Sequence, residues 1–246
     1  MILTADGPMT YEPKDVVDFH GALAGEWEQR YLKNSFRARI EVLQEGLKDC
    51  ALAGRSWLDA GCGTGTLSRF LADKGCSVLG VDAALPMIEV ARQQGARHSQ
   101  ANKMKFEVLA TIEQLPNASA SLDGILCSSV LEYVPDVERC LAEFARVLKP
   151  DGLTVISVPN AQSLVRKSQV SAHHWGRRLG RRWLDFVQYS RNEYSTAEFT
   201  DLLGTHGFEV RRVLVFGSPL PRWVQRRRFG GSLLLFVAVR SNSSAE

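Results

Sequence analysis

Short apolar runs rich in β-branched residues alternate along this chain with segments in which apolar residues recur at helical spacing. The short runs predict strands, and the segments between them predict helices. We expect the helices around residues 66–73, 86–95, 137–148 and 196–205. We expect the strands at residues 56–60, 77–81, 105–109, 124–127, 153–158, 208–216 and 233–240.

This alternation indicates a parallel sheet with helices on both faces. No helix separates the last two predicted strands, so we expect them to pair as an antiparallel hairpin at the sheet edge. The predicted fold is therefore α/β, a Rossmann-like doubly wound sheet of about seven mostly parallel strands. Residues 1–55 are mainly helical and predict a lid beside the carboxyl ends of the strands. Residues 56–246 would form the core, with an insertion at 161–195.

Composition narrows the class of protein only slightly. The chain has 246 residues, 45% of them hydrophobic, which suits one domain with a substantial core. A formal net charge of +3 is too small to indicate a nucleic-acid binder. The five cysteines include no CxxC pair, so we expect a reducing compartment and no zinc site. The first 20 residues have no apolar core of signal-peptide type, and we expect a cytoplasmic location.

The stretch "WLDAGCGTGTLSRFLADKGCSVLGVDA", residues 57–83, carries the clearest sign of chemistry. Gly61, Gly63 and Gly65 lie between a predicted strand and a predicted helix, where a ligand can approach the backbone closely. Asp82 ends the next predicted strand, at the distance expected for a carboxylate that accepts both hydroxyls of a ribose. A nucleoside-type ligand is therefore expected.

Dinucleotides and S-adenosylmethionine both bind at such a turn, and the glycine spacing distinguishes them. The dinucleotide pattern GxGxxG, begun at Gly61, requires glycine at position 66 and meets Thr66. The chain instead has an acidic residue, Asp59, two positions before the first glycine. A carboxylate would repel a pyrophosphate but suits a cationic amino-acid end, so a dinucleotide-dependent oxidoreductase is disfavoured.

Longer stretches resemble the class I S-adenosylmethionine-dependent methyltransferases over roughly residues 15–240. The resemblance lies in "LDAGCGTGTLSRFLADKGCSVLGVDAALPMIEVAR", "LEYVPDVERCLAEFARVLKPDGLTVISVPN" and the C-terminal hairpin. Two further stretches, "FHGALAGEWEQRY" and "NEYSTAEFTDLLGTHGFEV", are similar to the small-molecule branch that contains ubiquinone-type and natural-product O-methyltransferases. The resemblance implies an enzyme that uses S-adenosylmethionine, leaves S-adenosylhomocysteine, and methylates a small aromatic or lipid-like acceptor at oxygen.

The resemblance also implies a set of cofactor contacts. The three glycines would face the methionine part, Asp59 its ammonium group, and Asp82 the ribose. Thr111 stands where the family often has an aspartate that accepts the adenine amino group, which puts adenine selectivity in doubt. The full set is Tyr31, Arg39, Asp59, Gly61, Cys62, Gly63, Gly65, Asp82, Ala83, Met87, Thr111, Ile112, Cys127 and Ser128.

Methyl transfer depends mainly on positioning the acceptor atom, but a hydroxyl acceptor must also lose its proton. The candidate bases are His20 in the predicted lid, Tyr133 after the fourth predicted strand, and His173 and His174 after the fifth. Tyr133 stands where many relatives have histidine, so a histidine base at that position is excluded.

Basic and aromatic residues concentrate in the insertion, and the segment 166–191 leaves three interpretations open. It could cover the acceptor pocket with its arginines in solvent, contact an anionic membrane surface, or bind an anionic or nucleic-acid acceptor. Nucleic acid is disfavoured because the chain has no RNA-binding motif. The basic residues are Arg166, Lys167, Arg177, Arg178, Arg181, Arg182 and Arg191.

Other functions also stay open. The chain could methylate nitrogen or carbon, or it could bind the cofactor without methyl transfer, as a cyclase or a sensor. The partner is expected to be a small-molecule acceptor whose identity depends on the lid and insertion side chains. If the membrane interpretation holds, the protein is peripheral to a membrane.

Overall fold

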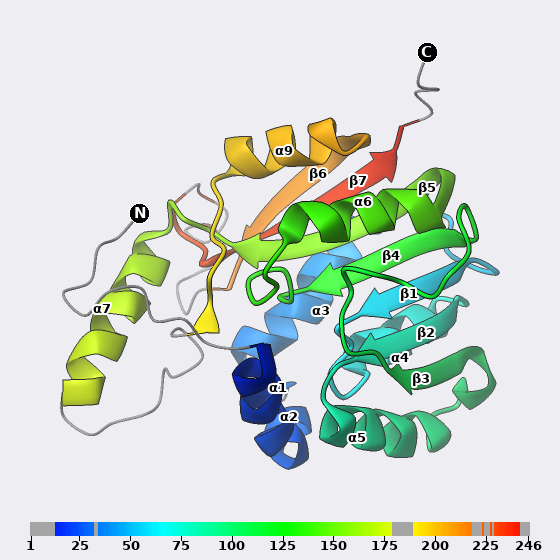
Figure 1. Ribbon diagram of the computed structural model, residues 1–246, viewed down its shortest axis with the longest axis horizontal. Coiled ribbons are helices and arrows are strands. Elements are labelled where there is room, and N and C mark those ends of the chain that lie inside the picture. The colour runs from blue at the N-terminus through cyan, green and yellow to red at the C-terminus, as the bar shows by residue number, and fades with distance from the viewer. Residues whose placement is uncertain are drawn as a thin grey trace.

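The computed structural model describes the chain apart from residues 1–12, 32–33, 179–188, 218–222, 224–226, 228 and 242–246. Its centre is one seven-stranded sheet with the order β3-β2-β1-β4-β5-β7-β6 (Figure 1). The strands are β1 (Ser56–Ala60), β2 (Ser77–Asp82), β3 (Met104–Val108), β4 (Leu122–Ser128), β5 (Leu148–Pro159), β6 (Phe208–Phe216) and β7 (Leu233–Arg240).

The strand directions confirm the predicted fold class. Strands β1 to β5 pair in parallel, whereas β7 is antiparallel to both β5 and β6. The last two strands therefore form the predicted antiparallel pair, with β6 at the sheet edge. The prediction that the fifth strand begins at residue 153 was wrong, because β5 begins at Leu148, which pairs with Leu122 of β4. The turn-forming residues "KPDG" obscured this start in the sequence.

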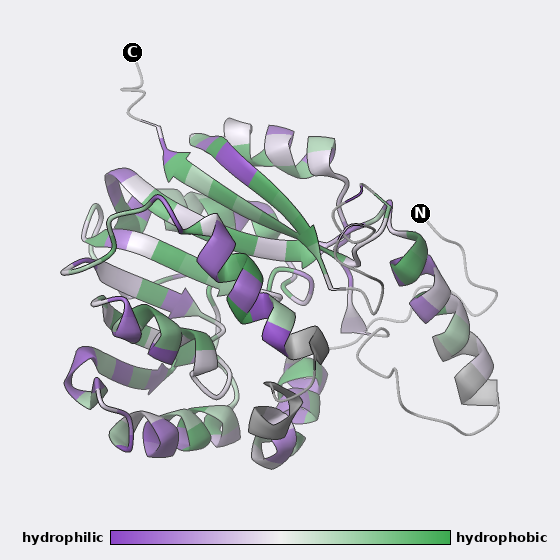
Figure 2. Cartoon of the chain, turned by 180° about the vertical axis from the view of Figure 1, so that it is seen from behind, coloured by the Kyte–Doolittle hydropathy of each residue, from purple (hydrophilic) through white to green (hydrophobic). Residues whose placement is uncertain are grey.

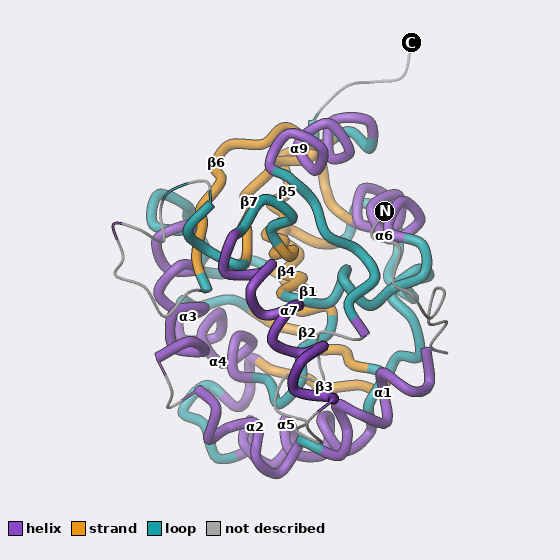
Figure 3. The backbone as a smooth tube through the Cα atoms, turned by 90° about the vertical axis from the view of Figure 1, so that its left-hand side faces the viewer, coloured by secondary structure: helices purple, strands orange, loops and turns teal. Residues whose placement is uncertain are grey.

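Helices cover both faces of the sheet (Figure 3). Described helices outside the predicted lid are α4 (Thr66–Asp73), α5 (Leu85–Ala96), the short 3₁₀ helix η1 (Ala101–Lys103), α6 (Val137–Val147), α7 (Leu164–Arg178) and α9 (Thr196–Thr205). The apolar side chains of α6 and α9 pack on one face, with Phe144, Phe199 and Phe236 at the centre of that layer. The opposite face packs against α3 and α4 through Leu43, Trp57 and Leu71. The central strands β4, β5 and β7 are consequently buried along most of their length. Figure 2 colours the hydrophobic residues of the strands green.

The segment predicted as a lid forms three helices, α1 (Pro13–Ala22), α2 (Ala24–Tyr31) and α3 (Asn34–Gly46). Helices α1 and α2 lie against α5, with Ala24 and Trp27 packed around Met87. Helix α3 packs on β6 and β7. Arg212 of β6 fixes its carboxyl end by donating to the Glu45 carbonyl at 2.7 Å. Thus α1 and α2 lie near the carboxyl ends of the strands, and α3 joins them to the core.

The close contact between β1 and β4 requires a residue without a side chain. Gly124 of β4 is the register partner of Trp57 in β1, and Trp57 is buried. A Cβ atom at position 124 would lie 2.3 Å from the Trp57 ring. Because strands β1 and β4 hold the site described below, this contact positions it.

Replacing Gly124 by alanine should destabilise the fold by roughly 1–3 kcal/mol, because the Trp57 ring has no space into which to move. Gly204→Ala in α9 is the matched control, since a Cβ there meets nothing within 4 Å. That control should be neutral or stabilise by up to about 1 kcal/mol. Denaturant unfolding of both variants measures the difference. Equal free energies of unfolding for the two variants would contradict the packing argument.

Candidate functional site

A cavity of about 350 Å³ opens at the carboxyl ends of β1, β2 and β4. This is where ligands bind in open α/β sheets, because the strand-to-helix turns converge there. Its walls come from α1, α2, α3, the turns after β1 and β2, and the segments after β3 and β4. Of the residues predicted from the sequence, the cavity is lined by His20, Arg39, Asp59, Gly61, Cys62, Gly63, Asp82, Ala83, Met87, Thr111, Ile112, Ser128 and Tyr133.

The turn after β1 depends on its three glycines. Gly61, Gly63 and Gly65 have φ values of +78°, +52° and +77°, in the left-handed region that side chains rarely adopt. A Cβ atom at Gly61 would lie 2.2 Å from Val130, and one at Gly65 would lie 2.8 Å from the Phe106 ring. Gly61 and Gly63 line the cavity, whereas Gly65 contacts the core and precedes α4.

Asp82 at the end of β2 is held by two backbone N–H groups. Its Oδ2 accepts from Gly63 at 2.9 Å, and its Oδ1 accepts from Ala84 at 2.9 Å. Burial raises the pKa of this carboxyl, and the two hydrogen bonds oppose that rise. Each carboxylate oxygen can accept a further hydrogen bond, so Asp82 is fixed in place and still able to bind a ligand.

Asp59 of β1 is a second carboxyl in the same wall and is buried, only 2% exposed. Its Oδ2 accepts from the Ser68 hydroxyl at 2.5 Å. Burial raises the pKa of Asp59 to about 7, and repulsion from Asp82 adds to the rise. Two neighbouring carboxyl groups give this end of the cavity a negative potential when ionised, which favours a cationic ligand.

A serine and arginine cluster forms the wall at the end of β4. Arg39 of α3 donates to the Ser129 hydroxyl at 2.7 Å and to Ser128 at 3.5 Å. Ser157 of β5 accepts from the Ser129 backbone N–H at 2.9 Å, which holds Ser129 at a φ of +57°. Cys127, the neighbour of Ser128, is completely buried in the core and does not line the cavity.

Sequence reasoning missed several residues of the cavity wall. Ser129, Val130 and Val134 line it after β4, and Val16 and Glu113 line it elsewhere. Ser129 lies two residues after the predicted strand 124–127, which was a usable signal. The valines carry no chemical signal, since an apolar residue in a helix or turn suits packing equally well.

The structure brings together two of the predicted bases, His20 and Tyr133, whose ring centroids are 5.0 Å apart. The Nδ1–H of His20 donates to the Val16 carbonyl at 2.9 Å, so Nε2 carries the lone pair of the neutral ring. The pKa of Tyr133 is raised well above its usual value by burial and by the Glu132 carboxylate. The raised pKa favours the protonated phenol of Tyr133, which can donate a hydrogen bond.

Three predicted residues have side chains that lie outside the described part of the structure. Tyr31 ends α2, and His173 and His174 lie within α7. No described residue of α7 lines the cavity.

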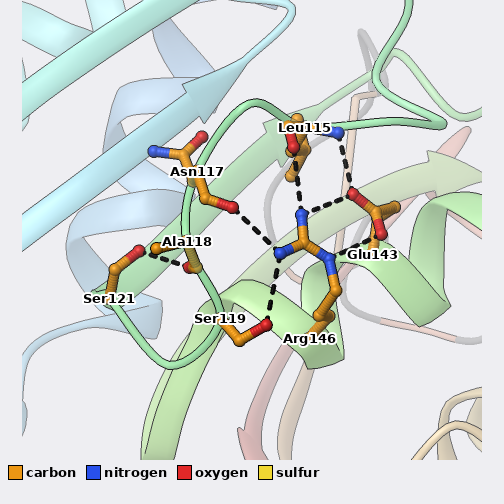
Figure 4. A network of polar contacts seen from close by, with 7 residues as sticks. All are labelled: Leu115, Asn117, Ala118, Ser119, Ser121, Glu143 and Arg146. Carbon is orange, nitrogen blue, oxygen red and sulfur yellow. Dashed lines mark hydrogen bonds and ion pairs between the residues drawn. The ribbon is translucent and has the colours of Figure 1, made fainter.

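The wall after β3 includes Thr111, whose hydroxyl accepts from the Glu113 backbone N–H at 3.1 Å. Arg146 and Glu143 of α6 fix the continuation of this loop (Figure 4). They form a bidentate ion pair with two contacts of 2.8 Å. Arg146 also donates to the carbonyls of Leu115 and Asn117, and Glu143 accepts from the Leu115 N–H. This ion pair forms hydrogen bonds with both the carbonyl and the N–H groups of the loop backbone, and so holds the loop in one conformation.

Other site types receive no support within the described residues. None of the described helices is long and apolar enough to cross a membrane. The described residues also contain no group of three or more His, Cys, Asp or Glu suited to a metal ion. All five cysteines are free thiols.

The glycine turn, the two carboxyl groups and the cavity coincide with a known domain. Residues 58–156 match the family model described as a methyltransferase domain. The chain is 39% identical over 111 residues to malonyl-[acyl-carrier protein] O-methyltransferase of Serratia marcescens, covering 45% of this chain and 41% of that protein. It is 32% identical over 149 residues to ubiquinone biosynthesis O-methyltransferase of Xanthomonas oryzae, covering 58% of this chain and 60% of the relative.

A solved structure extends the likeness over the whole fold. Magnesium protoporphyrin IX methyltransferase from Synechocystis, with bound SAH, superposes with a TM-score of 0.68 at 20% identity. The match covers 94% of this chain and 100% of that one. At this identity the likeness shows the fold alone. The chain spans about two fifths to three fifths of the length of the two curated relatives above. Residues 58–156 thus carry a methyltransferase domain, and the chain shares its fold with solved S-adenosylmethionine-dependent methyltransferases.

Proposed function

We propose that this protein transfers a methyl group from S-adenosylmethionine to a hydroxyl oxygen of a small aromatic or lipid-like acceptor. The observation that carries the proposal is the pair of carboxyl groups, the buried Asp59 and the half-buried Asp82, fixed beside the glycine turn. Asp82 has the geometry to accept both ribose hydroxyls, and Asp59 suits the ammonium group of the methionine part. The O-methyltransferase names of the two relatives support oxygen as the methylated atom.

The remaining cavity residues fit the rest of this cofactor. Gly61 and Gly63 leave space for its methionine part, and the Arg39 guanidinium suits its carboxylate. Ala83, Met87 and Ile112 are apolar surfaces for the adenine, and Thr111 offers its amino group only a neutral hydroxyl. When bound, S-adenosylmethionine supplies a methyl group activated by a sulfonium. The protein contributes position and proton removal.

The acceptor side of the cavity combines apolar walls with one candidate base. Val16, Val130 and Val134 are suited to an aromatic or aliphatic body. His20 Nε2 has the lone pair to take a hydroxyl proton, and the protonated Tyr133 beside it can orient the same oxygen. An amine acceptor would not need the base, so the role of His20 distinguishes O-methylation from N-methylation.

A contact with an anionic membrane surface is a separate part of the proposal. Lys167 and Arg191 are exposed, and the exposed apolar residues Leu164 and Trp175 lie on α7. The β6–β7 loop adds Trp223 and Phe229 as further exposed aromatics, and the Phe229 carbonyl accepts from the Leu164 N–H at 3.2 Å. Basic and aromatic side chains together favour an interface with anionic lipid.

One of the basic residues predicted for this surface, Arg166, does not belong to it. Arg166 is only 4% exposed, and its Nε forms an ion pair with Glu193 at 2.8 Å. Although the sequence places Arg166 among the basic residues of this segment, the Glu193 carboxylate compensates its charge. The basic residues Arg181 and Arg182 lie outside the described residues, and Arg177 and Arg178 have side chains outside them.

His20→Ala should lower the single-turnover rate of methyl transfer by ~10²–10⁴-fold for a phenol acceptor, with cofactor affinity nearly unchanged, because the lost interaction exists only during transfer. The assay uses labelled S-adenosylmethionine with panels of phenols, amines and carboxylic acids. His206→Gln, on the C-terminal cap of α9, is the control and should keep the parent rate. A His20→Ala rate within a few-fold of the parent on every phenol that is turned over would contradict the assigned base.

Vesicles that contain phosphatidylglycerol should sediment the protein at low salt and release it at high salt, because each basic residue near the surface contributes ~1 kcal/mol. Trp175→Ala should weaken this attachment. Val108→Ala, an equally apolar truncation at an exposed residue of β3, should leave it unchanged. Equal sedimentation with neutral and anionic vesicles at low salt would contradict the proposed contact with an anionic membrane surface.

A further inference from the structure

The turn after β4 is enclosed by the end of the insertion. This turn, residues 131–134, carries Tyr133 and Val134, which line the acceptor side of the cavity. The Asn192 side-chain amide donates to the Leu131 carbonyl at 2.8 Å and to the Val134 carbonyl at 3.0 Å. One planar NH₂ group therefore joins the first and last residues of the turn.

Glu132 makes the second connection between the same two segments. Its backbone carbonyl accepts from the Arg191 N–H at 2.8 Å and from the Asn192 N–H at 3.4 Å. Its side chain, only 4% exposed, accepts from the Ser190 hydroxyl at 3.2 Å. Three consecutive residues of the insertion end thus hold the backbone and one side chain of the turn.

The insertion end is itself anchored on both sides. The ion pair between Arg166 and Glu193 ties it to the first turn of α7. On the other side, the Tyr189 ring packs against Phe19 of α1, with ring centroids 4.9 Å apart. Phe19 directly precedes His20, whose ring contacts Tyr133. The insertion end consequently touches both elements that carry the acceptor-side residues.

We propose that Asn192 is a positioning residue for methyl transfer. It fixes Tyr133 and Val134 relative to His20 and so determines where the acceptor binds. This inference rests on the proposed function of the same cavity. Asn192 contacts the turn and not the cavity, so it acts through the residues that it holds. Its two donated hydrogen bonds are the required feature, because an aspartate of the same shape would place acceptors against two carbonyl oxygens.

Asn192→Asp tests the positioning role directly. We expect the KM for the acceptor to rise and the single-turnover rate to fall by about 10–100-fold, since small misplacements of this kind are costly. Cofactor affinity should stay within about two-fold, because the residues assigned to the cofactor lie elsewhere in the wall. Asn102→Asp, the same change at an exposed residue of η1, is the matched control and should leave all three quantities unchanged.

A readout independent of catalysis separates this inference from the proposed function. Deuterium uptake by a peptide spanning residues 129–136 should increase in Asn192→Asp and not in Asn102→Asp. Asn192→Gln, which keeps both donors on a longer side chain, should restore part of the protection, and it replaces Asn192→Asp if that variant does not fold. If the parent protein transfers no methyl group, the proposed function fails. Deuterium uptake by residues 129–136 then still tests whether Asn192 holds the turn. Unchanged uptake and unchanged acceptor kinetics in a folded Asn192→Asp variant overturn the inference.

Discussion

The site depends on the short distance between the glycine turn after β1 and the end of β2. The N–H groups of Gly61 and Cys62 donate to the Val81 carbonyl at 2.8 and 2.9 Å, and Gly63 donates to Asp82. These contacts are possible only because Gly61 and Gly63 adopt positive φ, with Val130 pressed against the first of them. The same backbone geometry opens the floor of the cavity and aims the Asp82 carboxylate into it. Parallel pairing of β1 with both β2 and β4 keeps all the walls in register.

This arrangement costs stability in the protein without ligand. The buried Asp59 and the half-buried Asp82 face one cavity, and Asp59 has only the Ser68 hydroxyl as its described side-chain partner. Folded Asp59 stays protonated up to its pKa of about 7, whereas the carboxyl of the unfolded chain ionises from its ordinary pKa of 3.8, so the free energy of unfolding falls as pH rises through that interval. A ligand with a positive charge reverses the penalty. The two carboxyl groups therefore lower the stability of the protein without ligand and suit the binding of a cationic ligand.

The sequence predicted the fold and the position of the cavity well, because both depend on local signals. The strand-helix alternation fixed the sheet, and the glycine spacing with Asp82 located the cavity. The surroundings of the turn after β4 could not be predicted in the same way, since they are built by contacts between distant segments. Asn192 meets Leu131 across 61 residues, and Arg166 faces Glu193 across 27. Arg166 illustrates the limit, because a basic residue in a basic segment gave no sign that it would be buried and paired.

The most direct test of the central claim is calorimetry of S-adenosylmethionine binding as a function of pH. In the proposed complex the carboxylate form of Asp59 faces the ammonium group of the cofactor, and burial raises the pKa of this carboxyl to about 7 in the protein without ligand. Binding should therefore take place with release of protons below pH 7, and affinity should rise with pH by up to about tenfold per pH unit below pH 7 and level off above it. Asp59→Asn should bind more weakly and lose this dependence, while Asp201→Asn, an exposed residue of α9, should match the parent. Affinity that is independent of pH in the parent, or equal affinity for NAD, would contradict the account.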